Sequence, residues 1–119
     1  MQRSFRLTRS EDFKRVRREG KSYAHPLIVL ITLKSERSDR PRVRVGIVSG
    51  KAVGTAVIRN RTKRLLREAM RILIPNIASN LDLILIARPK LASATLKETQ
   101  HALQTLFQRA QIIAPVNES

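Results

Sequence analysis

The 119-residue sequence contains no cysteine and no tryptophan, and aromatic residues make up only 3% of it. Without cysteine the chain forms neither disulfides nor thiolate-ligated zinc sites. The two histidines, His25 and His101, do not have the spacing of a metal-ligand pair. Hydrophobic residues still account for 42% of the chain. We therefore expect a single domain over residues 1–119 with a mainly aliphatic core.

Long hydrophobic runs are also lacking. No apolar run approaches the roughly 18 residues that a membrane-spanning helix needs. The first residues contain no hydrophobic segment of the kind found in secretion signals. These two features predict a cytoplasmic protein that does not need a membrane.

Acidic residues are scarce: nine Asp and Glu stand against 24 Lys and Arg, which gives a net charge of +15. Residues 1–71 hold 20 basic and 6 acidic residues, a net of +14, whereas residues 72–119 hold 4 and 3. A basic surface with no specific partner does not need such segregation. It favours a polyanionic partner, above all nucleic acid.

Groups suited to catalysis are few. No two carboxylates have a spacing that suggests a metal pair, and each is assigned to a helix end, a charged loop or a surface position. The segment Ser49–Thr55 contains two glycines and a lysine but lacks the spacing of a nucleotide phosphate loop. The sequence therefore predicts a chain that binds and positions its partner and does not cut it.

The stretch Ile58–Arg71 (IRNRTKRLLREAMR) divides into two faces when it is placed on a helix. One face, called the cationic face below, contains Asn60, Lys63, Arg64, Arg67 and Arg71. The opposite face contains Ile58, Thr62, Leu65, Leu66, Ala69 and Leu73, and Arg59 and Arg61 stand at the borders. We expect the apolar face to pack into the core. A polyanion would relieve the like-charge repulsion on the other face. Asn60 is a candidate for a hydrogen bond to RNA or for the outer shell of a hydrated metal.

The segment Ser49–Thr55 leads into this helix, and Thr55 is predicted to cap it. Free amides at a helix N-terminus bind phosphate, and Lys51 adds a positive charge nearby. The alternative is an ordinary loop. We expect the segment to bind an anion.

The remaining pattern predicts two further helices and three clear strands. Ser10 is predicted to cap a short helix that runs to about Glu19, buries Phe13 and Val16 and stops at Gly20. A capping box formed by Thr95 and Glu98 begins the last helix. The strands are predicted at Leu27–Leu33, Arg42–Val48 and Leu81–Ala87, with a weakly signalled one at Ser22–Ala24.

This order predicts one α/β (α+β) domain with a three- to four-stranded mixed sheet and three helices. The strands Leu27–Leu33 and Arg42–Val48 flank a polar loop, so we expect them to form a hairpin. The alternation in the second strand would then place Arg42 and Arg44 on an exposed face of the sheet.

The run Arg42–Arg71 resembles the signature of the bacterial ribonuclease P protein component. The positions that match the family's pattern are Ala56, Val57, Arg59, Asn60, Arg61, Lys63, Arg64, Arg67 and Glu68. The N-terminal helix and the strand Asp82–Arg88 fit the family as well. Gly50 replaces the first lysine of a common pair, and Thr55 replaces a common asparagine.

The resemblance implies a left-handed βαβ crossover, as in domain IV of elongation factor G. It also implies that the chain is the protein subunit of an RNA-dependent endoribonuclease. The partners would be a catalytic RNA subunit and the 5′ leader of precursor tRNA, with no protein partner required. Mg²⁺ would be bound mainly by the RNA subunit, and the protein would contribute no catalytic residue.

The resemblance further implies where RNA binds. The candidates for RNA binding are Lys51, Ala56, Arg59, Asn60, Arg61, Lys63, Arg64, Arg67 and Arg71. The candidates for a cleft that holds the single-stranded leader are Phe13, Arg17, Ile31, Arg42 and Arg44. Arg17 and Ile31 stand where relatives often have aromatic residues, so we expect weaker base stacking here.

Two other functions fit the composition. One is a structural RNA-binding protein of the ribosomal type without processing activity, and the other is a nonspecific DNA-compacting protein. The Arg-Asn-Arg run favours the ribonuclease P subunit over both.

Overall fold

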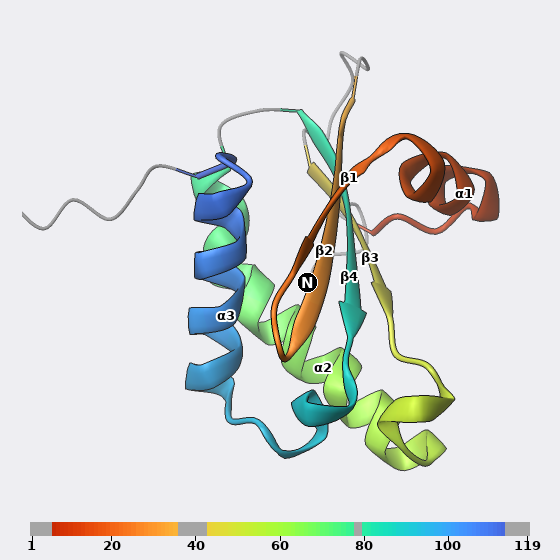
Figure 1. The fold of residues 1–119 in the computed structure, drawn as a ribbon, viewed down its shortest axis with the longest axis vertical. Coiled ribbons are helices and arrows are strands. Elements are labelled where there is room, and N and C mark those ends of the chain that lie inside the picture. Colours follow the sequence, from red (N-terminus) through yellow and green to blue (C-terminus); the bar gives the residue numbers. More distant parts are fainter. Residues whose placement is uncertain (1–5, 36–42, 78–79, 114–119) are drawn as a thin grey trace, which may run out of the picture.

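The computed structural model describes residues 6–35, 43–77 and 80–113. Three helices surround a four-stranded sheet (Figure 1). The helices are α1 (Ser10–Glu19), α2 (Ala56–Leu73) and α3 (Leu96–Arg109), and the strands are β1 (Lys21–Ala24), β2 (Ile28–Lys34), β3 (Val43–Val48) and β4 (Leu81–Ala87). Short 3₁₀ turns lie at η2 (Lys51–Val53), η3 (Ile74–Asn76) and η4 (Pro89–Ser93). The predicted fold class and all predicted elements are confirmed, including the weakly signalled strand β1.

The strands follow the order β1-β2-β4-β3. β4 is antiparallel to β2 and parallel to β3, which makes the sheet mixed. The predicted hairpin between β2 and β3 is therefore wrong, because β4 lies between them. β4 is the most continuously aliphatic strand and is buried along nearly its whole length, so the central position satisfies its hydrophobic pattern on both faces.

The crossover from β3 to β4 runs through α2. Its left-handedness and the likeness to domain IV of elongation factor G stay predictions. The predicted caps of α2 and α3 are confirmed. The Thr55 side-chain oxygen accepts a hydrogen bond from the Ile58 amide at 3.4 Å, and Thr95 and Glu98 form a reciprocal capping box. The predicted cap of α1 is wrong, because Ser10 is the first residue of that helix and Arg9, at the N-cap position, makes no side-chain capping hydrogen bond.

The two faces of the sheet are covered differently. α2 and α3 cover one face and bury the main aliphatic core, in which Phe107 is the largest side chain. α1 lies on the opposite face (Figure 1). A smaller cluster forms beneath it, made of Leu7, Val16, Ile31 and Ile84. Because α1 covers only part of this face, the sheet keeps an uncovered apolar region.

Two glycines allow α1 to approach the sheet closely. A Cβ atom on Gly46 of β3 would lie 2.4 Å from Cζ of Phe13. A Cβ atom on Gly20 would lie 2.4 Å from the Val16 carbonyl oxygen and 2.8 Å from Cγ2 of Ile31. Gly20 ends the helix as predicted, but its φ of −78° is open to any residue. The close approach is therefore what requires glycine there.

Candidate nucleic-acid interface

Helix α2 presents a buried apolar face and an outward cationic face, as the sequence predicts. Its buried side chains are Thr62, Leu66, Ala69, Met70 and Leu73. Met70 was not among the predicted core residues, and Ile58 and Leu65 are only partly buried. The burial fixes the rotation of α2 about its axis, so the opposite face is held outward.

The members of the cationic face differ in their surroundings. Asn60 and Arg64 are exposed, and Lys63 and Arg67 are half-buried. Arg71 is exposed and donates a hydrogen bond to Glu68 at 2.9 Å. That hydrogen bond lowers the pKa of the Glu68 carboxyl group. The predicted surface ion pair of Glu68 is thus confirmed.

The two border arginines are held against the protein. Nη2 of Arg61 donates to the Ala92 carbonyl oxygen in η4 at 3.0 Å. Nε of Arg59 is buried and has no hydrogen-bond partner within the described residues. The sequence gives no signal for either environment, because η4 lies about thirty positions further along the chain.

A buried pair of hydroxyl groups joins the end of β3 to α2. The side-chain oxygens of Ser49 and Thr62 are 2.8 Å apart, and Thr62 also donates to the Arg59 carbonyl oxygen at 2.8 Å. Lys51, the expected phosphate contact, is exposed in η2, and Ala56 is exposed at the start of α2. These contacts hold the N-terminus of α2 against the edge of the sheet.

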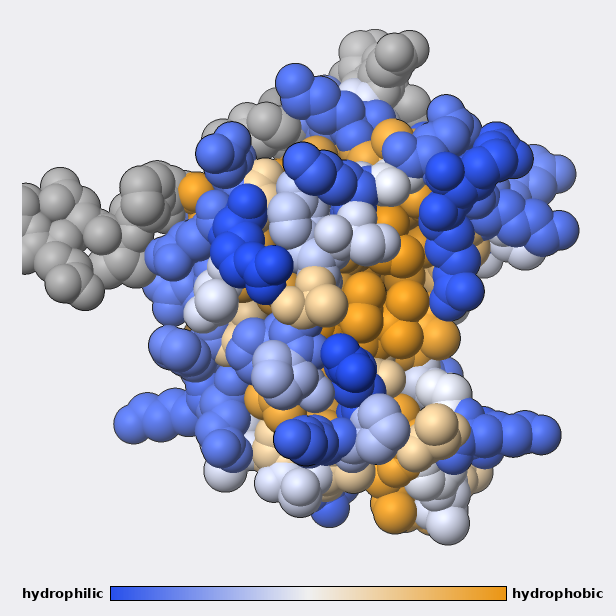
Figure 2. Space-filling model, in the orientation of Figure 1, coloured by the Kyte–Doolittle hydropathy of each residue, from blue (hydrophilic) through white to orange (hydrophobic). Residues whose placement is uncertain are grey.

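The leader-cleft candidates do not all lie together. Phe13 is half-buried over Gly46, and Ile31 is buried beneath α1. Arg17 is exposed on α1, and Arg42 lies outside the described residues. Beside α1, the half-buried side chains of Val29, Val48 and Ile86 form a continuous surface, called the apolar strip below. Figure 2 shows an apolar patch on this side of the molecule, below α1 and bordered by hydrophilic side chains.

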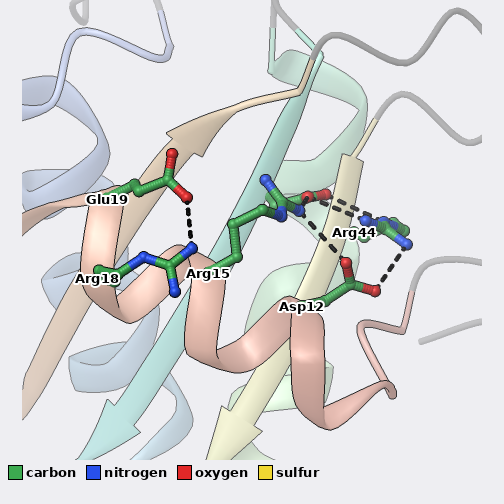
Figure 3. A network of polar contacts seen from close by, with 6 residues as sticks. Asp12, Arg15, Arg18, Glu19 and Arg44 are labelled. Atoms are coloured by element: carbon green, nitrogen blue, oxygen red, sulfur yellow. Dashed lines mark hydrogen bonds and ion pairs between the residues drawn. The ribbon is translucent and has the colours of Figure 1, made fainter.

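The expectation that Arg44 lies on an exposed face is wrong. Its side chain is only 16% exposed and lies on the face that α1 covers. Nε and Nη2 of Arg44 donate to the two carboxylate oxygens of Asp82 at 3.0 and 2.9 Å (Figure 3). Arg44 is therefore anchored inside the protein, since a paired acid beneath α1 holds its guanidinium group.

Asp82, which lies beneath α1 next to the leader-cleft candidates, was not among the predicted site residues. Its carboxylate is fully buried and also accepts a hydrogen bond from Arg15 of α1 at 2.5 Å. Burial alone would raise the pKa of Asp82, but the hydrogen bonds from Arg44 and Arg15 lower it below its usual value. The same contacts raise the pKa of both guanidinium groups. This network could not be predicted from the sequence, because the three residues come from separate elements.

Two cavities border the basic surfaces. One of about 210 Å³ lies at the outer edge of β3, where Arg6 and Arg67 approach Phe13 and Ile47. The other, of about 520 Å³, is lined by residues of the turn after β1 and of the end of β4, namely Ala24, His25, Pro26, Arg88, Pro89 and Lys90. Burial of the His25 ring, together with the charges of His101 and Arg109, lowers the pKa of His25. Neither cavity was predicted, because each is formed by segments far apart in the sequence.

Metal-binding groups do not gather in the part of the chain that the structure describes. No cluster of three or more His, Asp or Glu side chains is found there. Among the same residues, no helix is both long enough and apolar enough to cross a bilayer.

Known proteins match this chain along nearly its whole length. The family model Ribonuclease P matches residues 1–111. The ribonuclease P protein component of Exiguobacterium sp. is 42% identical over 112 residues, covering 94% of this chain and 95% of the relative. That of Herpetosiphon aurantiacus is 44% identical over 112 residues, covering 94% and 89%.

Solved structures show the same fold. The RNase P protein of Staphylococcus aureus aligns with a TM-score of 0.82 at 29% identity, covering 94% of this chain and all of that one. The RNase P protein of Thermotoga maritima aligns with a TM-score of 0.76 at 30% identity, covering 87% and 96%. Because the family model matches residues 1–111 and relatives above 40% identity cover most of the chain, the chain belongs to the ribonuclease P protein component family.

Proposed function

We propose that this chain is the protein subunit of ribonuclease P that binds the catalytic RNA and the 5′ leader of precursor tRNA. In this role it assists the Mg²⁺-dependent removal of the leader to give the mature 5′ end of tRNA. The observation that carries the proposal is the cationic face of α2, which is held outward because the opposite face is buried against the core. Family membership favours this function over the ribosomal and DNA-compacting alternatives.

The catalytic RNA is assigned to the cationic face of α2. Arg64 is exposed and has no acidic partner on the neighbouring turns, where Glu68 is already paired with Arg71. Guanidinium groups bind phosphate oxygens in a bidentate manner and stay charged at any physiological pH. The half-buried Arg59 and the exposed Lys51 extend this surface toward the N-terminus of α2.

The leader is assigned to the opposite face of the sheet. The apolar strip offers a surface on which unpaired bases can lie, and Phe13 lies at its side with part of its ring accessible. Arg6 and Arg67 line the cavity next to Phe13 and can bind the phosphates of the same strand. In this arrangement the bases contact the apolar strip and the phosphates contact the arginines. Only a single-stranded RNA has bases free to make such contacts.

The hydrolysis itself is assigned to Mg²⁺ held by the RNA. Mg²⁺ prefers carboxylate and phosphate oxygens, and the only acid on α2 is Glu68, which Arg71 occupies. Asn60 is exposed among cations and offers at most a hydrogen bond to a metal-bound water. The protein therefore binds and orients, and the RNA supplies the metal ligands.

The salt dependence of binding tests the α2 assignment. Arg64→Ala should weaken binding to the catalytic RNA and reduce the log–log salt slope by about 0.7–0.9, because one phosphate contact is lost. Lys97→Ala removes an exposed cation from α3 and is the matched control, for which the slope should stay unchanged. Equal slopes for Arg64→Ala and Lys97→Ala would contradict the assignment.

A further inference from the structure

The sheet face that carries α1 is organised in three cross-strand rows. The strand registers pair Leu33 with Asp82 and Asp82 with Arg44 in the first row, Ile31 with Ile84 and Ile84 with Gly46 in the second, and Val29 with Ile86 and Ile86 with Val48 in the third. The third row is the apolar strip. The contacts of α1 and of Gly20 at its end fall on the first two rows, at Asp82, Ile31 and Gly46, whereas all three side chains of the third row are half-buried. The position of α1 therefore decides how far the strip is open.

Apolar contacts alone hold α1 weakly. Val16 is its only buried residue, and Phe13 rests on Gly46 with part of its ring accessible. The helix is otherwise polar, and four of its ten residues are basic. A helix with so little buried apolar surface needs further contacts to take one position.

Those contacts come from the first row. The buried carboxylate of Asp82 accepts hydrogen bonds from Arg15 of α1 at 2.5 Å and from Arg44 of β3 at 2.9 and 3.0 Å. Asp12 of α1 lies 3.4 Å from both guanidinium groups and closes the network (Figure 3). Two residues of α1 are thus bound to two adjacent strands, Arg15 to Asp82 of β4 and Asp12 to Arg44 of β3.

We propose that Asp82 is a positioning residue, which holds α1 over the first two rows through Arg15, Arg44 and Asp12 and so sets the width of the leader-binding face. This inference rests on the proposed binding of the leader to that face. Asp82 is fully buried and touches no RNA itself, so it acts only through α1. Its lowered pKa keeps it ionised at neutral pH, where the two arginines need a counter-charge.

Asp82→Asn has two opposing effects on the affinity for RNA. Asp82→Asn raises the net charge of the protein by one, which on its own tightens binding to any polyanion. Displacement of α1 weakens binding, but only the part of the binding that depends on the leader. We expect Asp82→Asn to weaken binding of precursor tRNA with a long leader by about threefold to thirtyfold. Affinity for precursor with a single-nucleotide leader and for the catalytic RNA should not fall.

The matched control is Glu19→Gln, which makes the same change of net charge on α1. Glu19 is exposed, and its one ion pair among the described residues is with Arg18 at the surface, at 3.0 Å. A second test variant, Asp12→Asn with Arg15→Gln, detaches α1 while it keeps the net charge and the pair between Arg44 and Asp82. This double variant decides the question if Asp82→Asn does not fold.

The experiment is a binding titration of the reconstituted complex with long-leader and single-nucleotide-leader precursors. Since the natural chain has no cysteine, spin labels at Lys14→Cys on α1 and Lys34→Cys on β2 report the position of α1 directly. We expect both test variants to broaden this distance distribution and to lose leader-dependent affinity, with Glu19→Gln like the natural protein. Unchanged leader dependence in both would overturn the positioning role. Absence of leader dependence in the natural protein would instead overturn the proposed leader binding.

Discussion

At the scale of single residues, the side chain that sequence reasoning described least well is Asp82. A lone acid near the start of an aliphatic strand gives no sign of its partners. Arg15 and Arg44 are 67 and 38 positions away and meet it only after the sheet and α1 have assembled. Long-range charge pairing of this kind depends on register, which periodicity does not determine.

The buried carboxylate predicts a pH dependence of stability. Because the pKa of Asp82 is lower in the folded protein than the value of about 3.9 in an unfolded chain, its ionisation stabilises the fold above that pH. The stabilisation is lost as the pH falls through the lower, folded value. At neutral pH, Asp82→Asn should cost about 3 kcal/mol, since two arginines lose a buried partner.

Urea unfolding from about pH 7 down to about pH 1.5 measures this effect, because the loss of about 3 kcal/mol is spread over roughly two pH units below the unfolded value. The free energy of unfolding should fall on acidification more steeply for the natural protein than for Asp82→Asn, and the two curves should converge at low pH. Parallel curves would show that Asp82 does not contribute through its charge.

A substitution at Gly46 tests how much the close contact between α1 and the sheet contributes to stability. Gly46→Ala places a Cβ atom within 2.4 Å of Phe13, so the ring must move, and we expect a loss of about 1–3 kcal/mol in thermal or chemical denaturation. Gly50→Ala is the matched control, because a Cβ atom there meets nothing within 4 Å. Similar losses for both variants would mean that backbone flexibility, and not the contact with Phe13, explains the effect.

At the scale of elements, the helices and strands themselves could be predicted well, whereas the pairing of the strands and the contacts between elements could not. The 3.6-residue period and Thr55 predicted the start and orientation of α2, since capping and amphipathicity are local properties. The pairing of β2 with β3 was predicted wrongly because adjacency in sequence outweighed the stronger apolar character of β4. Contacts at the helix borders, such as Arg61 with Ala92, depend on this topology and could not be predicted.

The link between β3 and α2 yields a prediction of its own. Thr62→Val removes the buried hydroxyl group that lies 2.8 Å from that of Ser49, which leaves the latter without this partner. We expect a loss of about 1–3 kcal/mol in the free energy of unfolding. The double variant Ser49→Ala with Thr62→Val should be less destabilised than the sum of the two single variants, since no hydroxyl group is then stranded. Strict additivity would show that the two groups act independently.

At the scale of the whole molecule, the segregation of charge toward residues 1–71 becomes a spatial property. α1 and α2 carry half of the described basic residues and lie on opposite faces of the sheet, and both flank its β3 edge, where Arg6 and Arg67 line one cavity. Such a distribution suits a protein that meets RNA on two sides. The family could be recognised from the sequence because the motif of α2 is local, whereas the arrangement of the leader-binding face required the structure.

Cleavage of precursor tRNA at low Mg²⁺ tests the central claim most directly. In the proposed role the catalytic RNA performs the cleavage, so the purified chain alone should leave the precursor intact. The cognate catalytic RNA should cleave slowly alone and much faster with the chain present, since the cationic face of α2 and the leader-binding face hold RNA and substrate together. Equal cleavage by the RNA with and without the chain under these conditions would contradict the account.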